Sequence, residues 1–326
     1  PAPDAAAGQS ARRRWWYRGP GRRQPGQASR HPGSPHPSGQ PPAFAPERAP
    51  EPASGPTGLI AGVTLAAPRI EAPHAVTVHL LGELQVVFGE RPVGRWVSGR
   101  GRAVFEYLVI HRHTRVRRER LMNVFWPDAA PDAARNSLNV AIHGLRQSLR
   151  PAAGDRAVVV HGDRTYFIEP ALDIWVDVEV FEDRLKSARQ HLTGNEPAAA
   201  QADLEAAIGL YQGEFLADDP YEEWAHVNRE HLRLAYLDCL DQLGRLRFGA
   251  GDYSGCADVC LKLLACDNCR EDTQRLLMRC HSRLGQPQLA LRQYHSCVAT
   301  LRGELQLPPA AATTELAARI RRREEV

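Results

Sequence analysis

The segment PDAARNSLNVAIHGLRQSLR, residues 131–150, combines an apolar stripe with side chains that hydrogen-bond well to nucleic acid. At helical spacing, four large aliphatic residues flanked by two alanines share one face and predict a core-facing stripe. They are Leu138, Ile142, Leu145, Leu149, Ala134 and Ala141. The other side carries Asn136, Val140, His143 and Gln147, with Arg135, Asn139, Arg146 and Arg150 on its margins. No acidic residue occurs between Ala133 and Arg150, although a solvated helix usually alternates charge signs.

These polar side chains match the chemistry of base edges and phosphates. Asparagine and glutamine pair with adenine, valine packs on the thymine methyl group, and arginine binds guanine or phosphate. A lone helical face of this kind is more often simply solvated, so its structural context decides between the two interpretations.

The surrounding sequence predicts that context. Alternating or continuous apolar runs predict strands at 76–81 and 84–88, helical periodicity predicts helices at 101–112 and 117–127, and residues 156–170 read as a hairpin. The 131–150 helix is third, with Asp132 expected as its N-cap, and the hairpin turn is expected at Gly162-Asp163. Three helices followed by a hairpin form a winged helix–turn–helix, whose third helix enters the major groove while the hairpin lies along the backbone or minor groove.

Charge and composition divide the 326 residues into three parts. Residues 1–75 contain fifteen of the 25 prolines and nine arginines, and are expected to be disordered. Residues 76–170 carry fourteen arginines against nine acids, a balance of +5, whereas residues 171–326 have a balance of −7. A basic module indicates an anionic partner. Because the first residue is Pro1 and not methionine, we expect a fragment or an incomplete gene model.

From residue 176 onward the pattern is helical. Aligning GDYSGC (251–256) with GQPQLA (285–290) gives an offset of 34 residues, at which Leu243 matches Leu277 and Cys256 matches Ala290. Two helices in a 34-residue period are typical of tetratricopeptide repeats, and 194–212 reads as a related helix in a less certain register.

The seven cysteines all lie between Cys239 and Cys297. An odd number without a signal peptide favours reduced thiols in a cytoplasm. Cys256 and Cys260 occupy repeat-packing positions, which favours core packing, while Cys266-Asp-Asn-Cys269 with Cys280 and His281 could supply a redox or metal site. His111 and His113, at a helix end, suit a capping or solvated role. No run approaches the roughly 18 apolar residues of a membrane span, and no catalytic pattern is evident, so neither a membrane partner nor an enzyme is expected.

Several motifs resemble one family throughout residues 76–323. LLGELQVVFGERPV, RERLMNVFWPDAAPDAARNSLNVAIHGLRQSLR and DRTYFIEP resemble the DNA-binding domain of the Streptomyces antibiotic regulatory protein family of activators. VDVEVFE, IGLYQGEFL, RE-x-LR-x-x-YL, REDTQRLLMRCHSRLGQPQLALRQY and LRGELQLPP are similar to that family's bacterial transcriptional activator domain, a tetratricopeptide-like helical array.

The resemblance implies a sequence-specific activator that binds double-stranded DNA as a homodimer on direct repeats and recruits RNA polymerase. By position, it implies that Asn136, Asn139, Val140 and His143 face bases, that Arg135, Arg146 and Arg150 contact phosphates or base edges, and that Arg164 and Tyr166 of the hairpin meet the DNA backbone. The loop Pro127–Asp132 is the expected polymerase contact. The acidic array is expected to mediate dimerisation or to bind a protein or small-molecule regulator in its concave face. This function requires no metal and no cofactor.

The predicted fold class is therefore mainly α. A disordered arm (1–75) precedes an α+β winged helix–turn–helix DNA-binding domain (76–170) and an all-α tetratricopeptide-like domain (171–326).

Two positions depart from the family pattern. The family hairpin commonly reads Gly-Tyr where this chain has Thr165-Tyr166, and Gly144 stands where a side chain is usual, at a cost of about 1 kcal/mol of helix propensity. A close approach of the backbone to DNA would explain Gly144, and so would simple tolerance. Two alternatives stay open: a protein-interaction scaffold whose winged helix does not bind DNA, and a cysteine-based redox or metal sensor on the same frame.

Overall fold

Residues 75–326, which this computed structural model describes, begin with the strand pair that the apolar pattern predicts. β1 (Val76–His79) pairs antiparallel with β2 (Gln85–Phe88), and β3 (Arg91–Pro92) continues the meander. A strand that was not predicted, β7 (Ile174–Val176), pairs parallel with β1 and gives the order β3-β2-β1-β7. The segment expected to be disordered, 1–75, lies outside the described residues except for Ala75.

Three helices follow, as predicted, with shifted ends. α1 (Gly99–Ile110) is capped by Ser98, whose Oγ accepts from the Gly101 N–H; α2 is Arg118–Phe125 and α3 is Pro131–Ala153. The prediction that Asp132 is the N-cap of α3 is wrong. Ala130 holds that position and Pro131 opens the helix, because the fixed φ of proline suits the first helical residue. Asp132 instead lies in the first turn, where its charge favours the helix dipole.

The predicted hairpin is present and forms the wing. β5 (Val159–Gly162) pairs with β6 (Thr165–Ile168), and a short strand, β4 (Val116–Arg117), adds to the other edge of β6. The two turn residues are Asp163 and Arg164, one position later than expected, with φ of 49° and 59°. Positive φ at both central residues is what a type I′ hairpin turn requires. Thr165 Oγ1 donates to the Gly162 carbonyl at 2.6 Å and closes the turn.

Two glycines let α1 and α3 approach closely. A Cβ built on Gly101 would lie 2.7 Å from the Ala141 carbonyl oxygen, and one on Gly144 would lie 2.9 Å from the Ser98 Cβ. Ser148 Oγ donates to the Gly144 carbonyl and accepts from the Val97 N–H, which ties the same region together. Gly144 is therefore buried against the start of α1. The packing of the two helices, and neither a close approach to DNA nor simple tolerance, explains the glycine at this position.

We expect Gly101→Ala to lower the free energy of unfolding by about 1–3 kcal/mol, because the added methyl group meets helix backbone that cannot move aside. The better helix propensity of alanine, about 1 kcal/mol, offsets only part of this cost. Gly99→Ala, in the same helix with nothing within 4 Å of its Cβ, is the matched control and should be neutral or stabilising. Urea unfolding measures both; equal free energies for the two variants would contradict the close packing.

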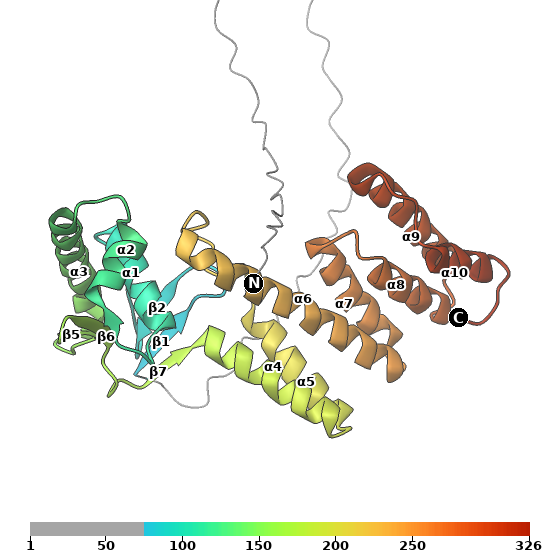
Figure 1. Cartoon of the computed structure of the whole chain (residues 1–326). Coiled ribbons are helices and arrows are strands. Elements are labelled where there is room, and N and C mark those ends of the chain that lie inside the picture. The colour runs from blue at the N-terminus through green and yellow to red at the C-terminus, as the bar shows by residue number, and fades with distance from the viewer. Residues whose placement is uncertain (1–74) are drawn as a thin grey trace, which may run out of the picture. The chain divides into compact units, whose positions relative to one another are not determined.

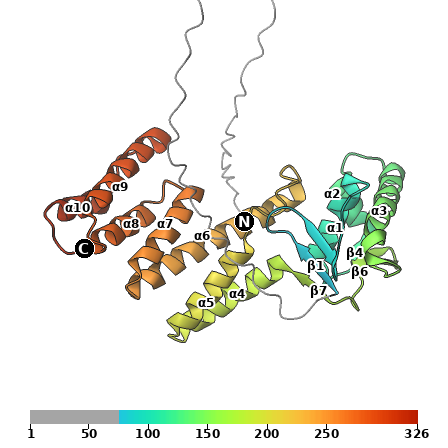
Figure 2. The same cartoon turned by 180° about the vertical axis from the view of Figure 1, so that it is seen from behind.

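The rest of the chain is an array of paired helices. The pairs are α4 (Asp177–Thr193) with α5 (Pro197–Leu210), α6 (His226–Gly249) with α7 (Tyr253–Cys266), and α8 (Glu271–Arg283) with α9 (Pro287–Thr300). A 3-10 turn at Glu223–Ala225 leads into α6, and a π-helical turn at Leu301–Leu305 precedes α10 (Ala311–Arg321). Figures 1 and 2 show consecutive helices of this array side by side.

One turn geometry joins each pair and confirms the repeat. A residue with positive φ follows the first helix in every case: Asn195 (57°), Gly251 (81°) and Gly285 (72°). The next N–H then donates back to the first helix, from Glu196 to the His191 carbonyl, from Asp252 to Arg247, and from Gln286 to His281. This is the 6→1 bond of a Schellman motif. The predicted 34-residue offset also holds for the elements themselves, α7 beginning at Tyr253 and α9 at Pro287.

The winged helix and the first helices of the array share one hydrophobic core. Asp177, 1% exposed at the start of α4, accepts hydrogen bonds from the Leu80 and Leu81 N–H groups at 2.8–2.9 Å. Phe215, fully buried, pairs through its backbone with Leu81. Residues on both sides of position 170 therefore pack together, and the division into domains at that position stays a prediction.

Among the described residues, none of the helices combines the length and the apolar character that crossing a bilayer requires.

Candidate nucleic-acid interface

Helix α3 has the two faces that its sequence predicts. The apolar stripe is buried: Ala134, Leu138, Ala141, Ile142, Leu145 and Leu149 are each at most 4% exposed. All of the predicted DNA-facing residues on α3 are exposed: Arg135, Asn136, Asn139, Val140, His143, Arg146, Gln147 and Arg150. Val140, a large aliphatic residue, is 69% exposed, so its apolar surface is available for another molecule to cover. The geometry thus presents amide, imidazole, aliphatic and guanidinium groups on one outward face.

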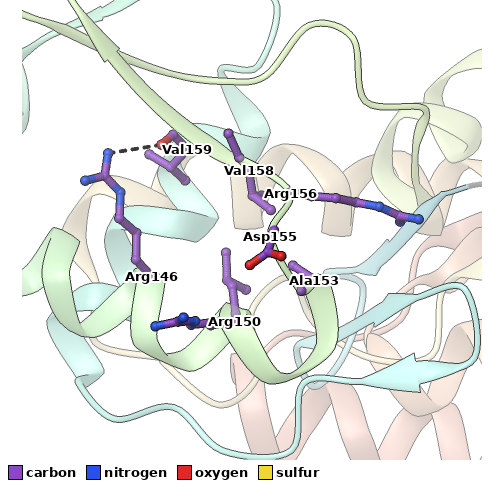
Figure 3. A pocket seen from close by; sticks show the side chains of 10 residues that line it. Arg146, Arg150, Ala153, Asp155, Arg156, Val158 and Val159 are labelled. Atoms are coloured by element: carbon purple, nitrogen blue, oxygen red, sulfur yellow. Dashed lines mark hydrogen bonds between the residues drawn. The ribbon is translucent and has the colours of Figure 1, made fainter.

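This face carries arginines near both ends and no acid beyond its first turn. Asp132 is the one acid of α3, and it forms an ion pair with Arg135 at 3.3 Å in the first turn. Arg146 is partly committed, because its Nη2 donates to the Val159 carbonyl of the wing at 3.2 Å (Figure 3). That bond ties the middle of α3 to β5 and makes Arg146 less free to reach a base than its neighbours.

A pocket of about 310 Å³ lies between the end of α3 and the start of the wing. Arg146 and Arg150 point toward one side of it, while Arg156, from the loop that links α3 to β5, points the opposite way (Figure 3). Asp155 lies between them. Arg156 was not among the predicted site residues. The signal that could have found it is its place at the first residue of the predicted hairpin, directly after the predicted third helix.

The two predicted wing residues lie in different environments. Arg164 is exposed at the tip of the hairpin turn, where it is free to meet a phosphate. Tyr166 is only 5% exposed, and its ring lies 4.6 Å from that of His161, between the neighbouring strands. Burial also raises the pKa of the Tyr166 hydroxyl. Its side chain packs within the wing, so DNA contact by Tyr166 stays a prediction with less structural support than contact by Arg164.

Ion pairs connect α1, the helix on which α3 packs, to the acidic residues that precede α6 in the helical array. Arg102 donates from Nε to Glu106 at 2.9 Å and from Nη2 to Asp218 at 2.5 Å, and Asp218 also accepts from the Leu84 N–H. Glu106 is fully buried, and its second oxygen has no hydrogen-bond partner among the described residues. Burial raises the pKa of Glu106 to about 7, with Asp219 and Glu222 adding to the rise and Arg102 opposing it.

This raised pKa predicts a pH-dependent stability. The pKa of Glu106 in the folded protein lies above its ordinary value of 4.5, so the protonated carboxyl favours the folded state. This contribution to the free energy of unfolding is complete below about pH 4.5 and is lost as the pH rises through 7. Relative to Glu106→Gln, the native protein should lose about 3 kcal/mol of unfolding free energy between pH 4.5 and 8. Urea unfolding of both proteins at several pH values measures the difference. Parallel pH profiles for the two proteins would contradict it.

The cysteines of the repeat positions are core residues, as predicted. Cys256 and Cys260 are at most 2% exposed and pack with Cys280, Ala257 and Leu277. Burial raises the pKa of the Cys239 thiol to about 12 and that of Cys297 to about 11, which disfavours the reactive thiolate at these two positions. No group of three or more metal-ligating side chains is arranged to hold an ion in the part of the chain that the structure describes.

The histidines at the end of α1 have local partners. His111 is the C-cap of that helix, and its ring stacks on Tyr107 with centroids 4.1 Å apart. His113 lies 3.2 Å from Glu179. The capping role predicted for this pair is confirmed at His111.

Comparison with known proteins matches both parts of the chain. The family model of the bacterial transcriptional activator domain matches residues 176–321, and that of the C-terminal domain of transcriptional regulatory proteins matches residues 96–166. No curated protein matches the chain.

Two solved structures are similar. Mycobacterium tuberculosis EmbR in complex with a low-affinity phosphopeptide has a TM-score of 0.63 at 22% identity, which shows a shared fold; the match covers 78% of this chain and 66% of EmbR. The C-terminal TPR-containing domain of a Plasmodium falciparum FK506-binding protein has a TM-score of 0.34 at 12% identity, covering 45% of this chain and 89% of that domain.

The two family matches fall on the winged helix and on the helical array respectively, in the order that the sequence motifs predict. Both families consist of transcriptional regulators. The chain therefore combines a regulator-type winged helix–turn–helix with a bacterial transcriptional activator domain, in the order that its resemblance to the Streptomyces antibiotic regulatory protein family implies.

Proposed function

We propose that the protein is a sequence-specific DNA-binding activator whose helix α3 reads base edges in the major groove. One observation carries this proposal: α3 buries its apolar stripe and exposes an almost acid-free face of amide and guanidinium groups. A helix of this kind, third in a winged helix–turn–helix, enters the major groove in related folds. The +5 balance of residues 76–170 supports an anionic partner.

The residues divide by chemistry into two groups. Asn136, Asn139, Val140, His143 and Gln147 face bases, because amides pair with adenine and valine packs on the thymine methyl group. Arg135, Arg150 and Arg164 neutralise phosphates and supply salt-dependent affinity that carries little sequence preference. Arg146 acts mainly as the link between α3 and the wing, through the Val159 carbonyl.

The protein binds direct repeats as a homodimer on DNA, and the loop Pro127–Asp132 contacts RNA polymerase. The helical array mediates dimerisation or binds a protein or small-molecule regulator. Its free thiols suit a cytoplasmic location.

Selection of genomic fragments by the full 326-residue chain tests the proposal. We expect enrichment of a repeated motif, with half-sites separated by a whole number of helical turns because two subunits bind one face of the duplex. A chain with Gln288→Ala, on the exposed side of α9, serves as the control and should select the same motif. A flat enrichment profile across the genome would refute sequence-specific binding.

A further inference from the structure

The α2–α3 loop and the segment before α6 together line a second pocket, of about 620 Å³. Trp126, Pro127, Asp128 and Ala129 form one wall, and residues 221–224 form the other, joined by Arg100 at the start of α1. The Arg100 guanidinium donates to Glu222 at 2.8 Å and so links the start of α1 to the second wall. A cavity of this size accommodates several residues of a peptide.

Aromatic rings make up much of the lining. Phe125 is buried, Trp126 and Trp224 are partly buried, and their ring centroids lie 5.9 Å and 6.3 Å from that of Phe125. Tyr221 is 94% exposed at the rim. Tyrosine and tryptophan are enriched where one protein covers another, so this lining suits a surface that another molecule covers.

The charge of the pocket is negative. It contains three carboxylates, Asp128, Glu222 and Glu223, against the single guanidinium of Arg100, which is engaged with Glu222. Neither Asp128 nor Glu223 forms an ion pair with another described residue. Carboxylates repel DNA phosphates, so this face does not suit nucleic acid. Carboxylates beside aromatic faces instead suit a guanidinium or ammonium group, which gains both ion pairing and cation–π attraction.

We propose that this acidic aromatic pocket docks an arginine- or lysine-bearing segment of a protein partner. This inference rests on the proposed function, under which the partner is RNA polymerase. It adds that the polymerase segment is basic and that residues 221–224 contact it together with the α2–α3 loop. The polymerase contact is then made jointly by the winged helix and by residues 221–224 of the following domain. Because the rings of Phe125 and Trp224 already pack against each other in the lining, docking requires little rearrangement.

The test uses purified bacterial RNA polymerase holoenzyme, the selected DNA and the full chain carrying Asp128→Lys/Glu223→Lys. We expect DNA binding to be retained and activated transcription to fall about tenfold, because like charges then oppose the docked segment. Asp258→Lys/Glu315→Lys makes the same charge change at exposed sites on α7 and α10, and should activate as the native chain does. Equal activation by both double variants would overturn the inference.

Photo-crosslinking identifies the occupant. A benzophenone amino acid in place of Tyr221 should crosslink, in the ternary complex, to a polymerase peptide that contains arginine or lysine. Crosslinking to DNA, to a second copy of the chain or to an acidic peptide would overturn the proposal, as would no crosslink in a complex that still activates. If the native chain binds the selected DNA but does not activate, the proposed function fails instead.

Discussion

Replacing Asp177 by alanine is expected to lower the free energy of unfolding by about 3–5 kcal/mol. The Asp177 carboxylate accepts the N–H groups of Leu80 and Leu81, and both leucines are at most 2% exposed. Alanine leaves these two donors buried without a partner, at about 1–3 kcal/mol for each, and leaves a cavity as well.

The same carboxylate begins α4 and so joins the array to the sheet of the winged helix. Its Oδ1 also accepts from the Val178 N–H at 2.8 Å. Because the winged helix and the first helices of the array share a core, we expect Asp177→Ala to destabilise both and the two to unfold together in a single transition. Asp183→Ala, exposed on the same helix, is the matched control and should change stability by less than about 0.5 kcal/mol. Urea unfolding followed by circular dichroism distinguishes them; a loss below about 1 kcal/mol for Asp177→Ala would contradict the account.

Local periodicity was enough to predict most elements of this fold. The three helices of the winged helix, the hairpin and the 34-residue repeat each follow from spacing within a short window. What the sequence did not predict depends on distant residues. β7 pairs with β1 across nearly one hundred residues, and Asp177 reaches Leu80 over the same span. No local pattern encodes such partners, since Asp177 reads simply as an acid in the first turn of a helix.

In the candidate site, too, the features set by local spacing were predicted and those set by distant contacts were not. The exposed residues of α3 were predicted from a helical wheel, because side-chain direction in a helix is set by spacing alone. Gly144 was misread because its reason lies on another helix, in Ser98. The inward packing of Tyr166 and the bond from Arg146 to Val159 likewise depend on how the wing packs, which strand alternation does not specify.

Gly144 and Thr165 depart from the family pattern, and a winged helix that no longer binds DNA could have explained both. Gly144 serves the α1–α3 contact, and Thr165 closes the hairpin turn through the Gly162 carbonyl. Both therefore support the geometry of a winged helix instead of indicating that its DNA-facing surface has decayed.

Removing the two asparagine amides of α3 should abolish most sequence preference while leaving general DNA affinity intact. Asn136 and Asn139 are exposed on the outward face, and each amide that pairs with a base edge contributes about 1–3 kcal/mol of discrimination. The double variant Asn136→Ala/Asn139→Ala should therefore lose about 100-fold in its preference for the selected motif. The arginines that contact phosphates are unchanged, so non-specific affinity and its salt dependence should persist. Alanine also favours the helix, so folding should not suffer.

The central claim, that the exposed face of α3 reads DNA sequence, is tested most directly by one ratio. This is the affinity for the selected motif divided by the affinity for a shuffled duplex of the same composition, measured at one fixed salt concentration. For Asn136→Ala/Asn139→Ala the ratio should fall about 100-fold, through weaker binding to the motif alone. For Gln288→Ala it should equal that of the native chain. An unchanged ratio in the asparagine double variant would contradict the claim.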